Sequence, residues 1–328
     1  MNAIPTIMPT TSPTTIPTTI ATPGATRTSA TRRASLGVAL AVALAGAACP
    51  QNGCNTVTQS QRSNLDRVSD AVLVNGPSGH SYVVSANPEL QHLRVLDLTT
   101  AFFVQSPNRF FPTSIPVGPE TRRITAAPDN DKRLYALDTS DDEIFEIVWS
   151  EQKLPSTTVP PLFTWTTTSS KIALPPGDVA PEDIAALDDD DGSTQLFVTV
   201  PEEHLMRMLV ANDGTAHHPP VSVTFAPDPA TGTPAEPGDV VVDAGGDTVV
   251  VADNALPVVH TIDRASIAAG APAVVDLDVG GPVSRLAVGV VDIGDGLAPV
   301  VIALRSDANI AVAIRLFRPG FREPRVAV

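Results

Sequence analysis

The chain has 328 residues, a formal net charge of −15 and only 4% aromatic residues. The excess of acidic side chains repels phosphate backbones and argues against nucleic-acid binding. A core must be built mainly from Val, Ile, Leu and Ala, and the 32 prolines separate short Val-rich runs, which favours many brief strands over long helices.

The N-terminal part predicts two segments. Residues 1–31 are rich in Thr and Pro and show neither helical nor strand periodicity, so we predict a disordered leader. Residues 32–48 begin with Arg32 and Arg33 and continue as a short run of small apolar residues, which is typical of an export signal. A membrane-spanning helix needs roughly 20 apolar residues, so the run is too short to be one. The segment also partly resembles a twin-arginine signal, from which Ser35 departs.

The apolar run ends in LAGAAC, which resembles the bacterial lipobox, with Gly46 as a departure from it. The resemblance implies that Cys49 is lipidated and becomes the N-terminus, so that residues 49–66 are the attachment site and a tether. It implies a location in the bacterial cell envelope, held to the membrane by the lipid, and Pro50 after the cysteine implies the outer membrane where two membranes are present. The alternative is ordinary cleavage, which leaves Cys49 and Cys54 free to form a disulfide in a secreted protein.

Residues 67–328 contain five copies of one pattern, in which short apolar strands alternate with turns rich in Asp, Gly and Pro. The first large residue of the middle strand marks the register in each copy: Tyr82, Tyr135, Phe197, Val250 and Val301. With the short apolar piece between copies, each unit has four strands. Four-stranded sheets repeated every roughly 50 to 60 residues predict an all-β fold, a β-propeller of four-stranded blades with five repeats visible. The total number of blades stays open, and so does the question of whether the propeller is incomplete.

The second copy, TSIPVGPETRRITAAPDNDKRLYALD, resembles the YVTN-type β-propeller repeat. Asn130 replaces the turn glycine of that repeat, and Asp138 stands where its final Asn is usual. Members of the family include surface proteins, periplasmic binding proteins and lactonase-like enzymes. The resemblance therefore implies the fold more than the function.

Two expectations concern secondary structure outside the repeated core. Residues 151–171 account for the longest interval between copies, and we predict that they form an extended loop. We also predict that no helix after residue 65 exceeds about three turns, because the Val-rich runs between turns are short.

Motifs for catalysis and metal binding are weak. The run LDDDDGS, residues 187–193, fails the spacing of an EF-hand and reads as a solvated turn. The histidines show no close metal-binding spacing, and GPSGH lacks the spacing of a nucleophile elbow. We therefore predict no catalytic residues, no metal site and no cofactor.

Acidic residues recur in the turns between the second and third strands of the copies, which emerge on the same side of a propeller as the connections between blades. The candidate binding residues there are Asp141, Asp142, Glu202, His204 and Asp253, and Glu89, Glu203 and Asp307 lie in equivalent turns. An acidic rim suits a cation, a basic peptide or a polar glycan. Asp and Asn also favour turns for local reasons that are unrelated to binding.

These patterns predict an exported, lipid-anchored and monomeric β-propeller that acts as a binding or scaffold protein at the cell envelope, with an unknown protein, peptide or glycan as its partner. A lactonase-like hydrolase and a purely structural surface module are the alternatives. The three hypotheses are separated by one observation: whether convergent polar side chains line the mouth of the central channel, or only scattered acidic residues of turns do.

Overall fold

The described part of the molecule lies within the C-terminal four-fifths of the chain. The computed structural model describes residues 68–106, 112–127, 132–140, 142–155, 161–175, 180–189, 192–211, 220–243, 245–292, 297–316 and 325–327. The predicted leader, export signal, lipidation site Cys49 and tether lie outside these residues and stay predictions. In the described ranges, no helical segment has the length and hydropathy that a bilayer-spanning helix needs.

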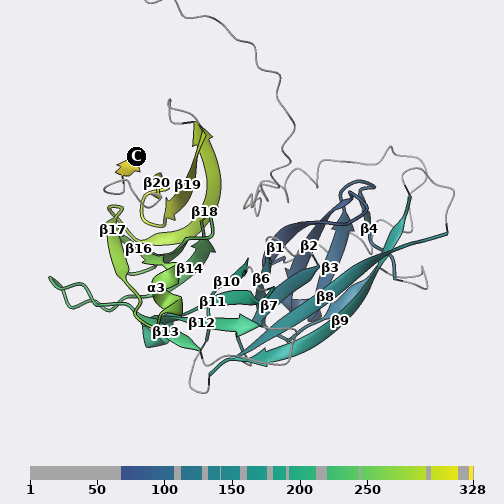
Figure 1. Ribbon diagram of the computed structural model, residues 1–328, viewed down its shortest axis with the longest axis horizontal. Coiled ribbons are helices and arrows are strands. Elements are labelled where there is room, and N and C mark those ends of the chain that lie inside the picture. The colour runs from purple at the N-terminus through teal and green to yellow at the C-terminus, as the bar shows by residue number, and fades with distance from the viewer. Residues whose placement is uncertain are drawn as a thin grey trace, which may run out of the picture. The chain divides into compact units, whose positions relative to one another are not determined.

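Five antiparallel sheets follow one another along the chain (Figure 1). We number them as blades 1 to 5. Blade 1 contains β1 (Asp70–Asn75), β2 (Ser81–Asn87), β3 (His92–Asp97), β4 (Phe102–Phe103) and β5 (Ser114–Pro116). Blade 2 contains β6 (Thr121–Ala126), β7 (Arg133–Asp138), β8 (Glu143–Lys153) and β9 (Phe163–Ala173). Blade 3 contains β10 (Ile184–Asp188), β11 (Thr194–Val200), β12 (Leu205–Ala211) and β13 (Val221–Thr224).

Blades 4 and 5 have the same plan. Blade 4 contains β14 (Pro237–Val242), β15 (Thr248–Asp253), β16 (Val258–Asp263) and β17 (Val274–Asp278). Blade 5 contains β18 (Val283–Asp292), β19 (Leu297–Arg305), β20 (Ala311–Arg315) and β21 (Arg325–Ala327). In blades 2 to 5 the four strands pair in chain order, and in blade 1 the first four do, which confirms the predicted all-β fold of propeller blades. In blade 1, β4 and β5 both pair with β3.

The first strands of the blades are the innermost ones. β1 contacts β6, β6 contacts β10, β10 contacts β14, and β14 contacts β18. Contacts between first strands of successive sheets are typical of blades that repeat radially. Helices are short in the described part: η1 (Pro88–Leu90), η2 (Pro201–Glu203) and α3 (Arg264–Ala268). The prediction that no helix exceeds about three turns is confirmed for these residues.

The second strand of each inner blade is buried on both faces, which explains its continuous apolar sequence. In β7, Leu134 and Ala136 pack in the cluster that blade 2 shares with blade 1, whereas Tyr135 and Leu137 pack with blade 3. Every side chain of β11 is buried. A strand that is covered on both sides needs no polar face, so apolar residues follow one another without alternation.

Strand pairing corrects the register at two of the five repeat marks. In blades 2, 3 and 4, the innermost strand contains an apolar run, and the first residue of this run pairs with a residue of the second strand. The predicted marks Tyr135, Phe197 and Val250 each directly precede that paired residue. In blades 1 and 5 that position belongs to Val84 and Ile302, so the marks Tyr82 and Val301 were wrong. Val301 faces the cluster shared with blade 4, because a shift of one residue turns a strand side chain to the opposite face.

The expected extended loop at residues 151–171 is also wrong. β8 and β9 pair without interruption from Glu143↔Ala173 to Lys153↔Phe163, so most of that segment is a long hairpin. Its far end reaches blade 1, where Gln105 forms a parallel bridge with Thr164. The repeated Thr and the two Trp residues of the hairpin favour strands. The longer interval between copies, from which the loop was predicted, is explained by the length of this hairpin.

Candidate functional site

Each blade has a turn between its second and third strands, and we call the edge of the blade that contains this turn the rim. Two of the rim turns have the same structure. η1 and η2 both begin with a proline and are followed by a residue in the left-handed region, Gln91 (φ 54°) and His204 (φ 57°). This places Glu89 and Glu202 at equivalent positions, and both residues are exposed. Proline fixes φ at the start of each turn, so the two carboxylates are presented on a preorganised backbone.

The other predicted residues of the blade 3 turn are engaged within the protein. Nδ1 of the partly buried His204 lies 2.6 Å from the carbonyl oxygen of Ala235. Since a carbonyl only accepts, Nδ1 carries the proton in this contact. Glu203 forms an ion pair with Arg207, with 3.2 Å between Oε2 and Nη2. His204 therefore connects its turn to the segment before β14, and of this turn Glu202 is the exposed member.

Asp253 is not an exposed rim carboxylate, which corrects the prediction. It is fully buried and accepts hydrogen bonds from the backbone N–H groups of Glu236, Ala255 and Leu256, at 2.7–3.3 Å. Its Oδ2 also lies 3.0 Å from Nε2 of His260. The sequence shows an aspartate at the start of a turn but not the direction of its side chain.

His260 is held between two carboxylates. Its Nδ1 lies 2.7 Å from Oδ1 of Asp276, and its ring stacks on Phe225 with centroids 4.3 Å apart. Burial alone would lower the pKa of His260, but the hydrogen bonds to Asp253 and Asp276 outweigh it and raise this pKa above its ordinary value. Burial would likewise raise the pKa of Asp253, yet its hydrogen bonds from His260 and the backbone lower it. Both ring nitrogens face carboxylate oxygens, an arrangement that favours the doubly protonated ring.

The remaining rim acids differ in environment. Asp141 lies outside the described residues, and Asp142 is partly buried in the left-handed region (φ 51°). In blade 5, Asp307 is exposed and accepts two hydrogen bonds from Arg305, at 2.9 and 2.7 Å. The turns therefore do not form a uniform acidic ring. Glu89 and Glu202 are the strongest candidates, and Asp142 stays a candidate.

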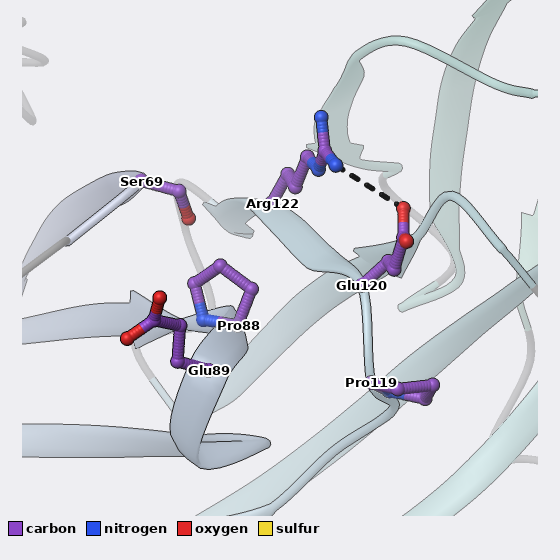
Figure 2. A pocket seen from close by; sticks show the side chains of 6 residues that line it. All are labelled: Ser69, Pro88, Glu89, Pro119, Glu120 and Arg122. Carbon is purple, nitrogen blue, oxygen red and sulfur yellow. Dashed lines mark hydrogen bonds and ion pairs between the residues drawn. The ribbon is translucent and has the colours of Figure 1, made fainter.

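A shallow depression of about 420 Å³ lies beside the blade 1 turn (Figure 2). Its lining joins the η1 turn and the start of blade 1 to the connection that leads into blade 2: Ser69, Pro88, Glu89, Pro119, Glu120 and Arg122. Arg122 and Glu120 form an exposed ion pair with 3.2 Å between Nη2 and Oε2. Glu89 and Glu120 are the two carboxylates among the residues that line the depression.

A second hollow of about 380 Å³ lies between the outer edge of blade 1 and the β8–β9 hairpin. Its walls are mainly apolar and include Phe102, Phe103 and Phe163, with Asp97 and Gln105 among the polar members. Phe102 is 57% exposed. Both oxygens of Asp97 are already engaged by His80 and by backbone N–H groups, so this hollow offers few polar groups to a ligand.

A row of charged side chains at the start of the innermost strands is the feature that the sequence analysis missed. We call it the inner charged row: Asp70, Arg123, Asp183, Asp239 and Arg285. Each aspartate accepts a backbone N–H of the next blade, Asp70 from Ile124 at 3.0 Å, Asp183 from Val240 at 2.8 Å and Asp239 from Leu286 at 2.6 Å. The signal in the sequence is one charged residue directly before each innermost apolar run.

The arginines of the row pair with its aspartates. Nε of Arg123 lies 3.3 Å from Oδ1 of Asp183, and Nη1 of Arg285 lies 3.3 Å from Oδ1 of Asp239. These polar side chains converge, but their known partners are other members of the row and the backbone. The row therefore connects successive blades. Within the described ranges, no group of three or more His, Cys, Asp or Glu side chains is arranged to hold a metal ion.

No protein-family model matches the chain, and no curated protein matches its sequence. Among solved structures, a protein of unknown function from Desulfotomaculum acetoxidans DSM 771 has a TM-score of 0.50 and 12% identity, over 75% of this chain and 69% of that chain. A β-propeller domain from Myceliophteria thermophila has a TM-score of 0.47 and 9% identity, over 78% and 72%. A periplasmic gluconolactonase from Pseudomonas aeruginosa has a TM-score of 0.39 and 16% identity, over 77% and 69%. Likeness at such identities concerns the fold alone, and the YVTN resemblance stays an interpretation.

Proposed function

We propose that the protein is a non-enzymatic binding module whose rim captures a basic protein or peptide at the bacterial cell envelope. The observation that carries the proposal is the repeated turn that presents Glu89 and Glu202 at equivalent positions in blades 1 and 3. The net charge of −15 adds long-range attraction for a cationic partner. A partner that meets several blades would gain from acids held on fixed turns, because little conformational entropy is lost when preorganised groups bind.

The shape of the rim depression also supports a macromolecular partner. A small-molecule site is usually a concave pocket with apolar walls that encloses most of its ligand. The depression beside Glu89 is instead lined by only six residues, with Glu120 and Arg122 exposed at its border. Such a surface suits the side chains of an extended basic segment.

The rim is tested by the double variant Glu89→Gln with Glu202→Gln. Exposed ion pairs are individually worth about 0–1 kcal/mol, so we expect a several-fold loss of affinity for an oligolysine probe and a flatter dependence of the affinity on salt concentration. Isothermal titration calorimetry at two salt concentrations measures both.

The matched control is Asp263→Asn, since Asp263 is exposed and lies at the end of blade 4 opposite its rim turn. Because the control removes one charge and the double variant removes two, an equal loss of affinity per removed charge would mean that net charge alone attracts the probe. The hydrolase alternative makes a different prediction: a stoichiometric, tightly held divalent ion in the purified protein would contradict the non-enzymatic proposal.

The anchor is tested by Cys49→Ser. If the lipobox resemblance holds, this variant should lose palmitate labelling and move from the detergent phase to the aqueous phase, because the serine hydroxyl cannot form the thioether to the lipid. Cys54→Ser is the control and should keep both properties. Unchanged detergent partitioning of Cys49→Ser would exclude lipid anchoring and leave the secreted, disulfide-bonded alternative.

A further inference from the structure

Each of the four junctions between successive blades contains one buried apolar cluster, to which both blades contribute. At the last junction, Val250 and Ala252 of β15 share such a cluster with Val301 of β19. The side chains of a strand alternate between two faces, so blades 2, 3 and 4 each contribute to one cluster with either face. An inner blade of this protein therefore buries apolar side chains on both of its faces.

Blade 5 also carries apolar side chains on the face that points away from blade 4. Val301 and Ala303 of β19 lie in the cluster shared with blade 4, so Ile302 and Leu304 lie on the opposite face. Leu304 is 43% exposed and pairs with the exposed Ala311 of β20. We call this surface the end face of blade 5: Ile302, Leu304 and Ala311.

Blade 1 has a corresponding face that points away from blade 2. Val74 and Val84 lie in the cluster shared with blade 2, whereas Leu73 and its partner Val83 lie on the opposite face, which we call the end face of blade 1. Leu73 is 38% exposed, and Val83 belongs to a small cluster whose members all come from residues 83–103. Among the residues that the structure describes, no set of contacts comparable to those of successive first strands joins β18 to β1.

Arg285 gives the end face of blade 5 a positive charge. It pairs with Leu304 across β18 and β19, and its side chain is 49% exposed. Arg123 holds the equivalent place in blade 2 and reaches forward into blade 3, where its Nε lies 3.3 Å from Oδ1 of Asp183. Asp70 holds in blade 1 the place in the inner charged row that Asp183 holds in blade 3. A blade 1 that docks on blade 5 would thus present a carboxylate to Arg285.

We propose that a second copy of this chain docks the end face of its blade 1 on the end face of blade 5, so that two copies assemble head to tail through two identical contacts. The contact joins two apolar surfaces and pairs Arg285 with Asp70 of the second copy. It continues, between two chains, the arrangement of the four junctions within one chain. The assembly departs from the monomer that the sequence predicts.

The internal junctions favour a second copy over the chain's own blade 1 as the occupant. Each junction is held by its buried cluster and by hydrogen bonds of the inner charged row, such as that from the N–H of Leu286 to Asp239 at 2.6 Å. To bring β1 against β18 within one chain would disturb closely packed side chains at several junctions. A second copy reaches the end face with every junction intact, and a pair of identical chains is the commonest closed assembly.

Light scattering after size-exclusion chromatography tests the assembly, with the full chain carrying Cys49→Ser and Cys54→Ser so that neither a lipid nor a native disulfide contributes. We expect twice the mass of one chain. Leu304→Asp should give the mass of one chain, because it places a charge in the apolar contact, and Leu73→Asp should do the same from the other side. Val275→Asp is the matched control and should keep the double mass, since Val275 is 53% exposed on β17, the outermost strand of blade 4. Circular dichroism shows that each variant is folded.

Cross-linking identifies which faces meet. Leu73→Cys and Leu304→Cys are made as separate chains in the same cysteine-free background, co-expressed and treated with a short bismaleimide. The co-expressed pair should give a product of two chains in a denaturing gel, whereas either variant alone should stay a single chain. Cross-linking of Leu304→Cys alone would mean that two blade 5 faces meet, and a link within one chain that carries both cysteines would mean that its own blade 1 is the occupant. Either result, or the mass of one chain before substitution at the end faces, would overturn the proposal.

Discussion

Replacing Trp149 by alanine is expected to lower the free energy of unfolding by about 3–5 kcal/mol. Trp149 is 1% exposed and stacks on Trp165 with ring centroids 3.8 Å apart and planes inclined by 9°. Both rings also form T-shaped contacts with Tyr82 in blade 1, with ring centroids 5.9 and 5.1 Å apart. Removal of the indole would leave a cavity at the contact between blades 1 and 2, and the surrounding strands can close it only in part.

The tip of the hairpin explains why that cavity cannot close easily. Glu151 accepts hydrogen bonds from the hydroxyl of Tyr82 at 2.5 Å and from the hydroxyl and N–H of Ser78 at 2.8 and 2.9 Å. Gly76 lies against the same carboxylate, and a side chain at this glycine would collide with it. The end of β8 is thus fixed to blade 1 on the far side of the tryptophan pair.

Urea unfolding followed by circular dichroism measures the effect, and Trp149→Phe should cost less because a ring is kept. Val148→Ala is the control, since Val148 is 40% exposed, and we expect a change within about 0.5 kcal/mol. A loss below about 1 kcal/mol in Trp149→Ala would mean that the hairpin does not stabilise the contact between blades 1 and 2.

The sequence predicted the blades because their signals are local. Short apolar runs such as those around Tyr135 and Val250 are separated by Asp, Gly and Pro, and these residues specify strands and turns without distant partners. The β8–β9 hairpin was missed because its stabilising contacts are with blade 1, far away in sequence. Tyr82 was chosen as a repeat mark for its size, although its ring belongs to that same contact.

The candidate site was predictable in part for the same reason. Glu202 stands in a Pro-Glu turn whose form depends on the turn itself, so its exposure could be foreseen. Asp253 occupies an equivalent place in the sequence, but His260 and three backbone N–H groups draw its side chain into the protein. The inner charged row was visible as single charges before apolar runs, yet only the packing of blades shows what these charges contact.

Asp253→Ala is expected to destabilise the protein by about 3–5 kcal/mol at neutral pH. The substitution removes the acceptor of three backbone N–H groups, of which that of Leu256 is buried, and leaves His260 with one carboxylate, Asp276. Loss of one partner from a buried, hydrogen-bonded charge pair is costly because the other charge stays in a poorly solvated place. Asp253→Asn should cost less, since the amide oxygen still accepts from the backbone.

Asp276→Ala is the matched control for the histidine, because the Asp276 side chain is 50% exposed and water can replace it. We expect a loss of about 1 kcal/mol there, by comparison with other exposed ion pairs. Thermal and urea unfolding of the three variants measure the difference. Equal losses for Asp253→Ala and Asp276→Ala would contradict a structural role for the buried pair.

The pH profile gives the sharper test. Since the folded pKa of His260 is raised, its contribution to stability is complete below its unfolded value of about 6.5 and is lost as pH rises through the folded value. The folded pKa of Asp253 is lowered, so its contribution is complete above about pH 4 and is lost as pH falls through the folded value. The pair should therefore stabilise the fold most between about pH 4 and pH 6.5. Asp253→Ala should weaken both limbs of the profile. A variant of Asp253 that kept both limbs would show that the pair does not titrate as one unit.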